Sequence, residues 1–85
     1  MALIKPQFEA GREFVGKGGI VRDPAIHRQV LAEILNWTID NELAPMGLIR
    51  SPISGSDGNV EFFVWLRLAE ETDLNFSDAI QRVTS

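Results

Sequence analysis

The fold class is decided by residues 60–68, which read VEFFVWLRL. Aromatic and β-branched residues dominate this stretch, which is typical of a β-strand. Apolar side chains occupy both alternating sets of positions, so both faces of the strand are apolar. The sequence therefore predicts an interior strand of a covered sheet.

The segment before this strand completes a hairpin. Residues 46–53 are interpreted as an extended segment that ends near Pro52, and residues 54–59, SGSDGN, are typical of a turn. Two strands joined by a short turn run antiparallel. We therefore expect 46–53 and 60–68 to form an antiparallel pair.

A long helix precedes the hairpin, over residues 24–42. Asp23 can cap the free amides of its first turn, and Pro24 suits the first helical position. An apolar stripe follows at helical spacing, formed by Ile26, Val30, Leu31, Ile34, Leu35 and Trp37. His27 lies in the first turn, where we interpret it as a surface residue rather than a catalytic base, because no partner acid at suitable spacing singles it out.

Shorter elements flank these segments. Residues 2–4 are apolar and are stopped by Pro6, which indicates the last residues of a buried strand. A short helix or ordered loop is expected over 8–15, ended by GKGG at 16–19. The tail, residues 69–85, is expected to be helical, with Asn75 or Ser77 as the cap.

This order of elements, a βαββ unit with a helical tail, has a topological consequence. A helical crossover favours parallel alignment of the first two strands, so the third strand is antiparallel to both. Lys5 closes the first strand and Glu61 opens the third, which predicts that they are neighbours at the edge where open α/β sheets bind ligands. The pair is either a structural salt bridge or a group for acid/base chemistry.

Composition and charge exclude several function classes. The chain has 85 residues, no cysteine and one histidine, which argues against disulfide scaffolds, thiol nucleophiles and a zinc site, so no metal is expected. Its formal net charge is -4, with +2 over residues 1–28 and -6 over the rest. An acidic chain is not expected to bind RNA tightly by itself. The basic first third could face nucleic acid or be ordinary surface charge.

The chain also lacks a membrane signal. Its longest apolar run, residues 62–66, is far shorter than the roughly 20 residues that a bilayer span needs. The N-terminus shows no basic segment followed by an apolar stretch. We therefore expect a cytoplasmic chain with no membrane partner.

Three blocks of sequence resemble the TlyA-type proteins, which are often labelled haemolysins. The blocks are KPQFE at 5–9, GGIVRDP at 18–24, and SPISG at 51–55 with GNVEF at 58–62. They follow the family's order and cover roughly residues 2–68. The resemblance implies an S-adenosylmethionine-dependent ribosomal RNA 2′-O-methyltransferase, whose FtsJ-like Rossmann-like domain follows a small RNA-binding domain. Residues 1–85 would then be a single partial α/β domain, the C-terminal part of that methyltransferase sheet.

The resemblance also assigns roles to residues. FtsJ-like enzymes carry a Lys-Asp-Lys-Glu tetrad, and the match places its second lysine on Lys5 and its glutamate on Glu61. The lysine would assist deprotonation of a ribose 2′-hydroxyl that attacks the methyl group, and Glu61 would orient the lysine. Gln7, Glu9 and Asn59 would line the substrate site, with ordinary loop polar groups as the alternative for Gln7 and Glu9.

Several features of the family are absent from this sequence. It has no glycine-rich turn after a first strand, no acidic residue for the cofactor ribose, and neither the first lysine nor the aspartate of the tetrad. GKGG at 16–19 follows a loop, so it does not replace the cofactor turn. We therefore expect a fragment that is inactive alone, binds no S-adenosylmethionine alone, and forms a homo-oligomer through its open sheet edge. The alternatives are a non-catalytic interaction or oligomerising module and a small RNA-binding α+β domain.

Overall fold

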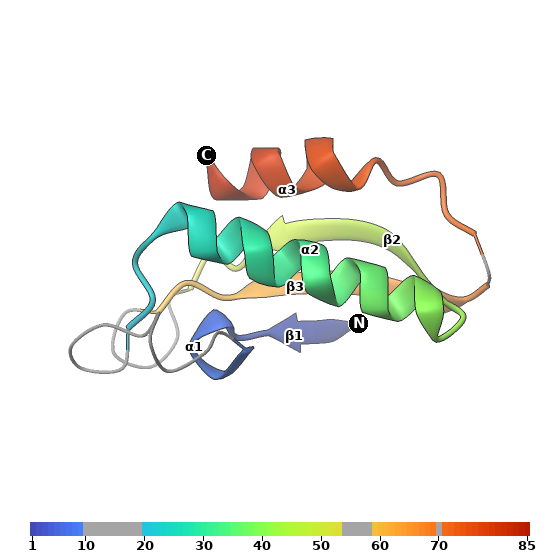
Figure 1. Ribbon diagram of the computed structural model, residues 1–85, viewed down its shortest axis with the longest axis horizontal. Helices are drawn as coiled ribbons and strands as arrows, with labels where there is room; N and C mark the ends of the chain where they lie inside the picture. Colours follow the sequence, from blue (N-terminus) through green and yellow to red (C-terminus); the bar gives the residue numbers. More distant parts are fainter. Residues whose placement is uncertain (10–19, 54–58, 70) are drawn as a thin grey trace.

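The computed structural model describes residues 1–9, 20–53, 59–69 and 71–85. The elements in chain order are β1 (Ala2–Ile4), α1 (Pro6–Glu9), α2 (Pro24–Asp40), β2 (Leu43–Arg50), β3 (Phe62–Leu68) and α3 (Phe76–Thr84) (Figure 1). This order confirms the βαββ unit with a C-terminal helix. Residues 10–15 of the short helix or ordered loop expected over 8–15, the GKGG segment at 16–19 and residues 54–58 of the turn expected at 54–59 lie outside the described residues.

The three strands form one sheet in the order β1-β3-β2. β3 lies in the middle and is antiparallel to both neighbours, with Ile4 opposite Phe62 and Leu48 opposite Val64. β1 and β2 therefore run in the same direction, as the helical crossover predicts. This arrangement brings the end of β1 next to the start of β3.

α2 begins where the sequence predicts and ends earlier. The Asp23 carboxylate accepts a hydrogen bond of 2.9 Å from the amide of Ala25, next to Pro24 at the first helical position. The helix stops at Asp40 rather than at residue 42, and Glu42 adopts a left-handed backbone with φ of 60°. This conformation turns the chain into β2.

β2 covers residues 43–50 rather than the expected 46–53. The register shifts between Pro45 and Gly47, so the strand carries a bulge there. The bulge lets a proline enter the sheet, because proline lacks the amide that a regular ladder needs. The proline therefore marks an irregularity inside the strand, whereas the sequence reading placed this residue before the strand.

The core lies between the sheet and the two longer helices. Its buried members are Ile4, Val30, Leu31, Leu35, Leu48, Phe62, Val64, Ala79, Ile80 and Val83. Both α2 and α3 contribute to this one cluster, so both helices pack on the same face of the sheet. α3 is capped by Asn75, whose side-chain oxygen accepts a hydrogen bond of 3.0 Å from the amide of Asp78.

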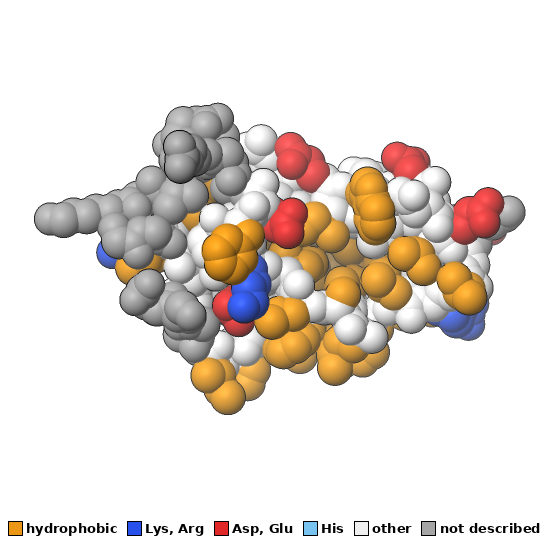
Figure 2. All heavy atoms as spheres, turned by 90° about the horizontal axis from the view of Figure 1, so that it is seen from below, with side chains coloured by type: hydrophobic (Ala, Val, Ile, Leu, Met, Phe, Trp, Pro, Cys, Tyr) orange, Lys and Arg blue, Asp and Glu red, His pale blue; other side chains and the backbone are white. Residues whose placement is uncertain are grey.

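The expectation of a sheet covered on both faces is corrected. In the described parts of the chain no helix packs on the second face, where Leu3, Ile49 and Trp65 are 45%, 42% and 40% exposed. Leu68 is 87% exposed because it lies at the far end of β3. Figure 2, which views the molecule from the β1 side, shows hydrophobic side chains at the surface.

The interpretation of His27 as a surface residue is also wrong. The side chain is 6% exposed, and its ring meets Phe62 edge-on with centroids 5.8 Å apart. Its Nε2 atom lies 2.8 Å from the carbonyl oxygen of Val21 and donates a hydrogen bond to it. The first turn of α2 lies over the start of β3, so a residue on the same face as Leu31 and Leu35 is buried there.

Among the described residues, no helix is long and apolar enough to cross a membrane.

Candidate functional site

Lys5 and Glu61 meet at one edge of the sheet. Lys5 follows the last residue of β1, and Glu61 precedes the first residue of β3. Because Ile4 pairs with Phe62, the next residue outward on each chain is brought together. The Lys5 Nζ atom lies 3.9 Å from Glu61 Oε2, which confirms that the two residues are neighbours.

The two partners differ in their access to solvent. The side chain of Lys5 is 41% exposed, whereas that of Glu61 is 11% exposed. A ligand arriving at this edge can therefore contact the ammonium group directly. The Glu61 carboxylate is largely closed to solvent and lies against Lys5.

Backbone hydrogen bonds fix both residues. The carbonyl oxygen of Lys5 accepts from the amides of Phe8 and Glu9, at 3.0 and 3.3 Å, which starts α1 at the lysine itself. Pro6 is buried beside it. The carbonyl oxygen of Glu61 accepts from the amide of Ser51 at 2.8 Å, which ties it to the end of β2. The site is thus held at a strand-to-helix corner on one side and in a hairpin on the other.

Asn59 is buried beneath the site, at 3% exposure. Its Oδ1 atom accepts a hydrogen bond of 3.0 Å from the amide of Val21. The carbonyl of the same Val21 accepts from His27, so one residue is held at both its amide and its carbonyl. These bonds connect the segment before α2 to the segment that carries Glu61.

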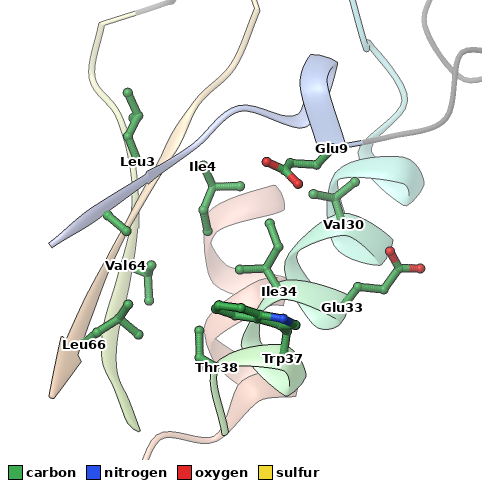
Figure 3. A pocket seen from close by; sticks show the side chains of 11 residues that line it. Leu3, Ile4, Glu9, Val30, Glu33, Ile34, Trp37, Thr38, Val64 and Leu66 are labelled. Carbon is green, nitrogen blue, oxygen red and sulfur yellow. The ribbon is translucent and has the colours of Figure 1, made fainter. Parts of the chain in front are cut away.

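Gln7 and Glu9 lie on α1, after Lys5. The Oε1 atom of Gln7 is buried and has no hydrogen-bond partner in the described ranges. Glu9 is exposed and reaches a hollow of about 430 Å³ between β1 and α2 (Figure 3). Figure 3 shows the Glu9 carboxylate near Ile4 and Val30, with the ring of Trp37 farther down the hollow. The lining of this hollow includes neither Lys5 nor Glu61. The carboxylates of Glu9 and Glu33 would repel a phosphate group there.

Sequence reasoning missed Phe8. This residue is 75% exposed, and its ring centroid lies 5.8 Å from the Lys5 Nζ atom. The signal was available, because an aromatic residue lies three positions after the lysine inside the KPQFE block. Lys5, Glu61 and Phe8 together form what we call the edge cluster.

Over the described ranges, no group of three or more His, Asp or Glu side chains could hold a metal ion.

The chain is similar to a known protein family over the segment that contains this site. The family profile described as FtsJ-like methyltransferase matches residues 1–68, which contain all three members of the edge cluster. The chain belongs to this family. Among curated relatives, the 16S/23S rRNA (cytidine-2'-O)-methyltransferase TlyA of Mycobacterium tuberculosis is 36% identical over 86 residues. This alignment covers 98% of the chain and 32% of TlyA.

Two other curated relatives also match most of the chain. YqxC of Bacillus subtilis is 54% identical over 66 residues, which cover 78% of the chain and 24% of YqxC. Hemolysin A of Brachyspira hyodysenteriae is 42% identical over 62 residues, covering 73% of the chain and 26% of that protein. The chain thus spans about a quarter to a third of the length of these curated relatives.

A solved structure shares the fold. The protein from Streptococcus thermophilus named "putative hemolysin" superposes with a TM-score of 0.88 at 41% identity. The superposition covers 98% of the chain and 30% of that protein. The βαββ unit with its terminal helix therefore occurs inside a larger folded chain.

Proposed function

We propose that this chain forms the part of an FtsJ-like catalytic domain that handles the ribose 2′-hydroxyl of ribosomal RNA. The observation that carries the proposal is the 3.9 Å approach of Lys5 and Glu61 inside the segment that matches the family. The name of TlyA supports the substrate class, since that relative modifies a cytidine 2′-oxygen in ribosomal RNA. On this proposal, residues 1–85 are one partial domain with a helical tail at 69–85.

The difference in exposure supports different roles for the two residues. A ribose hydroxyl is a weak nucleophile until a base takes its proton or a cation stabilises the developing negative charge on oxygen. Lys5 has the solvent access for the second of these roles: its ammonium group would lie against the 2′-oxygen and stabilise the negative charge that develops there as the hydroxyl proton passes to solvent. Glu61 is nearly buried, so its role is to hold the lysine in place.

Three further residues are proposed to shape the substrate site. Gln7 and Glu9 belong to the helix that starts at Lys5, and a substrate there would contact the exposed part of that turn. The Asn59 side chain already accepts from Val21, so its contribution to substrate binding would come mainly from fixing the segment that leads to Glu61.

S-adenosylmethionine is the proposed cofactor of the parent family. The hollow beside β1 has neither Lys5 nor Glu61 in its lining, so it does not place a cofactor next to the proposed reacting group. The sequence also carries no glycine-rich turn after a first strand. We therefore propose that the chain binds little or no cofactor alone and is inactive alone, and that its chemistry requires the rest of the domain.

A second candidate function is that of an oligomerising or interaction module. The specific observation in its favour is the exposed apolar face of the sheet, with Leu3, Ile49 and Trp65 each at least 40% exposed. An exposed edge strand beside such a face favours pairing with another copy.

A chimera tests the catalytic proposal. Residues 1–85 replace the aligned segment of Mycobacterium tuberculosis TlyA, and methyl transfer to ribosomal RNA is measured. We expect the chimera to be active and Lys5→Ala to lower kcat by a factor of about 100 or more, within the range for loss of a general acid or base. Arg67→Ala, an exposed cation on β3, is the matched control and should keep full activity. An active chimera that keeps its kcat after Lys5→Ala would overturn the assignment.

A further inference from the structure

Phe8 projects from the turn that begins at Lys5, and it is 75% exposed. Its amide donates a hydrogen bond of 3.0 Å to the carbonyl oxygen of Lys5, so Phe8 and the lysine belong to one hydrogen-bonded turn. The Nζ atom lies 5.8 Å from the ring centroid, within cation–π range. An exposed aromatic residue is common on surfaces, but this one is fixed next to the proposed reacting group.

The charged groups described near the ring bear on the kind of ligand. Glu9 is the next residue and is exposed, and the Glu61 Oε2 atom lies 3.9 Å from the Lys5 Nζ atom. Two acids beside one lysine disfavour a phosphate group at this place. A flat, uncharged ring is favoured instead, because it can stack on Phe8 without facing those carboxylates.

The spacing fits a nucleoside. A hydroxyl that bonds to the ammonium group lies about 3 Å from Nζ. Stacked aromatic rings have centroids roughly 4.5–7 Å apart. Both contacts can be made by one nucleoside, because the lysine and the ring centre are separated by 5.8 Å and both are open to solvent.

We propose that Phe8 is a stacking platform for the base of the target nucleotide, which holds the ribose of an unpaired nucleotide against Lys5. This inference rests on the proposed function and deepens it, because it states how the substrate is placed. Stacking on an aromatic side chain tolerates every base. Phe8 is therefore a positioning residue for an unstacked nucleotide, and it does not read the identity of the base.

A titration of the isotope-labelled chain with a six-nucleotide single-stranded oligoadenylate tests the platform. We expect the Phe8 ring protons to shift upfield, and Phe8→Leu to weaken binding roughly tenfold, as for loss of one stacked base. Phe8→Trp should restore binding. Trp37→Leu, which removes a 59% exposed aromatic ring from α2, is the matched control and should bind as the parent chain does. Ribose 5-phosphate, which has no base, should leave the ring shifts unchanged.

Three results would overturn the platform: unchanged Phe8 ring shifts, equal affinity of Phe8→Leu and the parent chain, or shifts with ribose 5-phosphate alone. Amide spectra of each variant check that the fold is kept. The chimera separates this inference from the proposed function. If Phe8→Leu leaves KM and kcat of the chimera unchanged while Lys5→Ala abolishes turnover, the platform fails and the catalytic role of Lys5 stands. If Phe8→Leu raises KM while Lys5→Ala has no effect, the platform stands and the catalytic role of Lys5 fails.

Discussion

At the scale of single residues, solvent exposure is what distinguishes the groups of the site. The side chain of Lys5 is partly exposed to solvent, that of Glu61 is nearly buried and that of Asn59 is buried, although all three lie at one end of the sheet. Lys5 is therefore the member of the three that solvent, and hence a substrate, can reach. Glu61 and Asn59 hold neighbouring backbone segments in place through their hydrogen bonds.

Asn59 should matter for stability. Asn59→Ala removes the acceptor of the buried Val21 amide, and leaving such a group unsatisfied costs about 1–3 kcal/mol. We expect the free energy of unfolding in urea to fall by that amount. Asn36→Ala, which removes an exposed side-chain bond on α2, is the control and should change it by less than about 0.5 kcal/mol. Equal effects of the two substitutions would contradict the role of the Asn59 bond.

The proximity of Lys5 and Glu61 could be predicted from the sequence, because the order and direction of the strands bring the end of β1 next to the start of β3. The burial of His27 could not be predicted in the same way. Its hydrogen-bond partner is the carbonyl oxygen of Val21, which lies outside the helix. Its spacing to Leu31 and Leu35 was nevertheless a signal of the buried face. Phe8 belongs to no periodic pattern, and its spacing of three positions after Lys5 was the one signal for it.

At the scale of the elements, the boundaries are set by backbone details that composition does not show. α2 ends because Glu42 turns the chain with a positive φ, and β2 begins early because a bulge accommodates Pro45. The helix start was predictable, since Asp23 and Pro24 are local signals. The helix end was not, because it carries no glycine to mark the left-handed position.

Glu42→Gly should stabilise the fold. Glycine adopts a left-handed backbone without steric cost, whereas other residues lose roughly 1–2 kcal/mol there. After the entropy lost by glycine, we expect a net gain of about 0.5–1 kcal/mol, visible as a higher melting temperature. Glu33→Gly, within α2, is the matched control and should lower stability by about 1 kcal/mol. A melting temperature that falls for Glu42→Gly would show that the positive φ costs nothing.

At the scale of the whole molecule, the chain is a layer of two helices on one face of a three-stranded sheet. The alternation of apolar residues along β3 correctly indicated two apolar faces, but only one of them is covered by described elements. The sequence could not reveal this, because covering the second face depends on groups outside the pattern of the strand. This apolar face is the physical reason to expect association.

The chain should associate with itself at high concentration, and the β1 edge should contribute. Leu3→Lys places a charge on this short edge strand and should shift the chain toward monomer, because edge charges block strand pairing. Gln29→Lys, which places the same charge at an exposed position on α2, is the control and should leave association largely intact. Sedimentation equilibrium gives the masses. A monomeric parent chain at every concentration would contradict this expectation.

The central claim is that Lys5 and Glu61 act as one unit on the substrate hydroxyl. A double-mutant cycle in the TlyA chimera measures this most directly, with kcat for Lys5→Ala, Glu61→Gln and the double variant. Residues that act as a unit give grossly non-additive losses, so we predict that the double variant loses about as much as Lys5→Ala alone. Losses that multiply would contradict the account, because they would show that the two residues contribute independently.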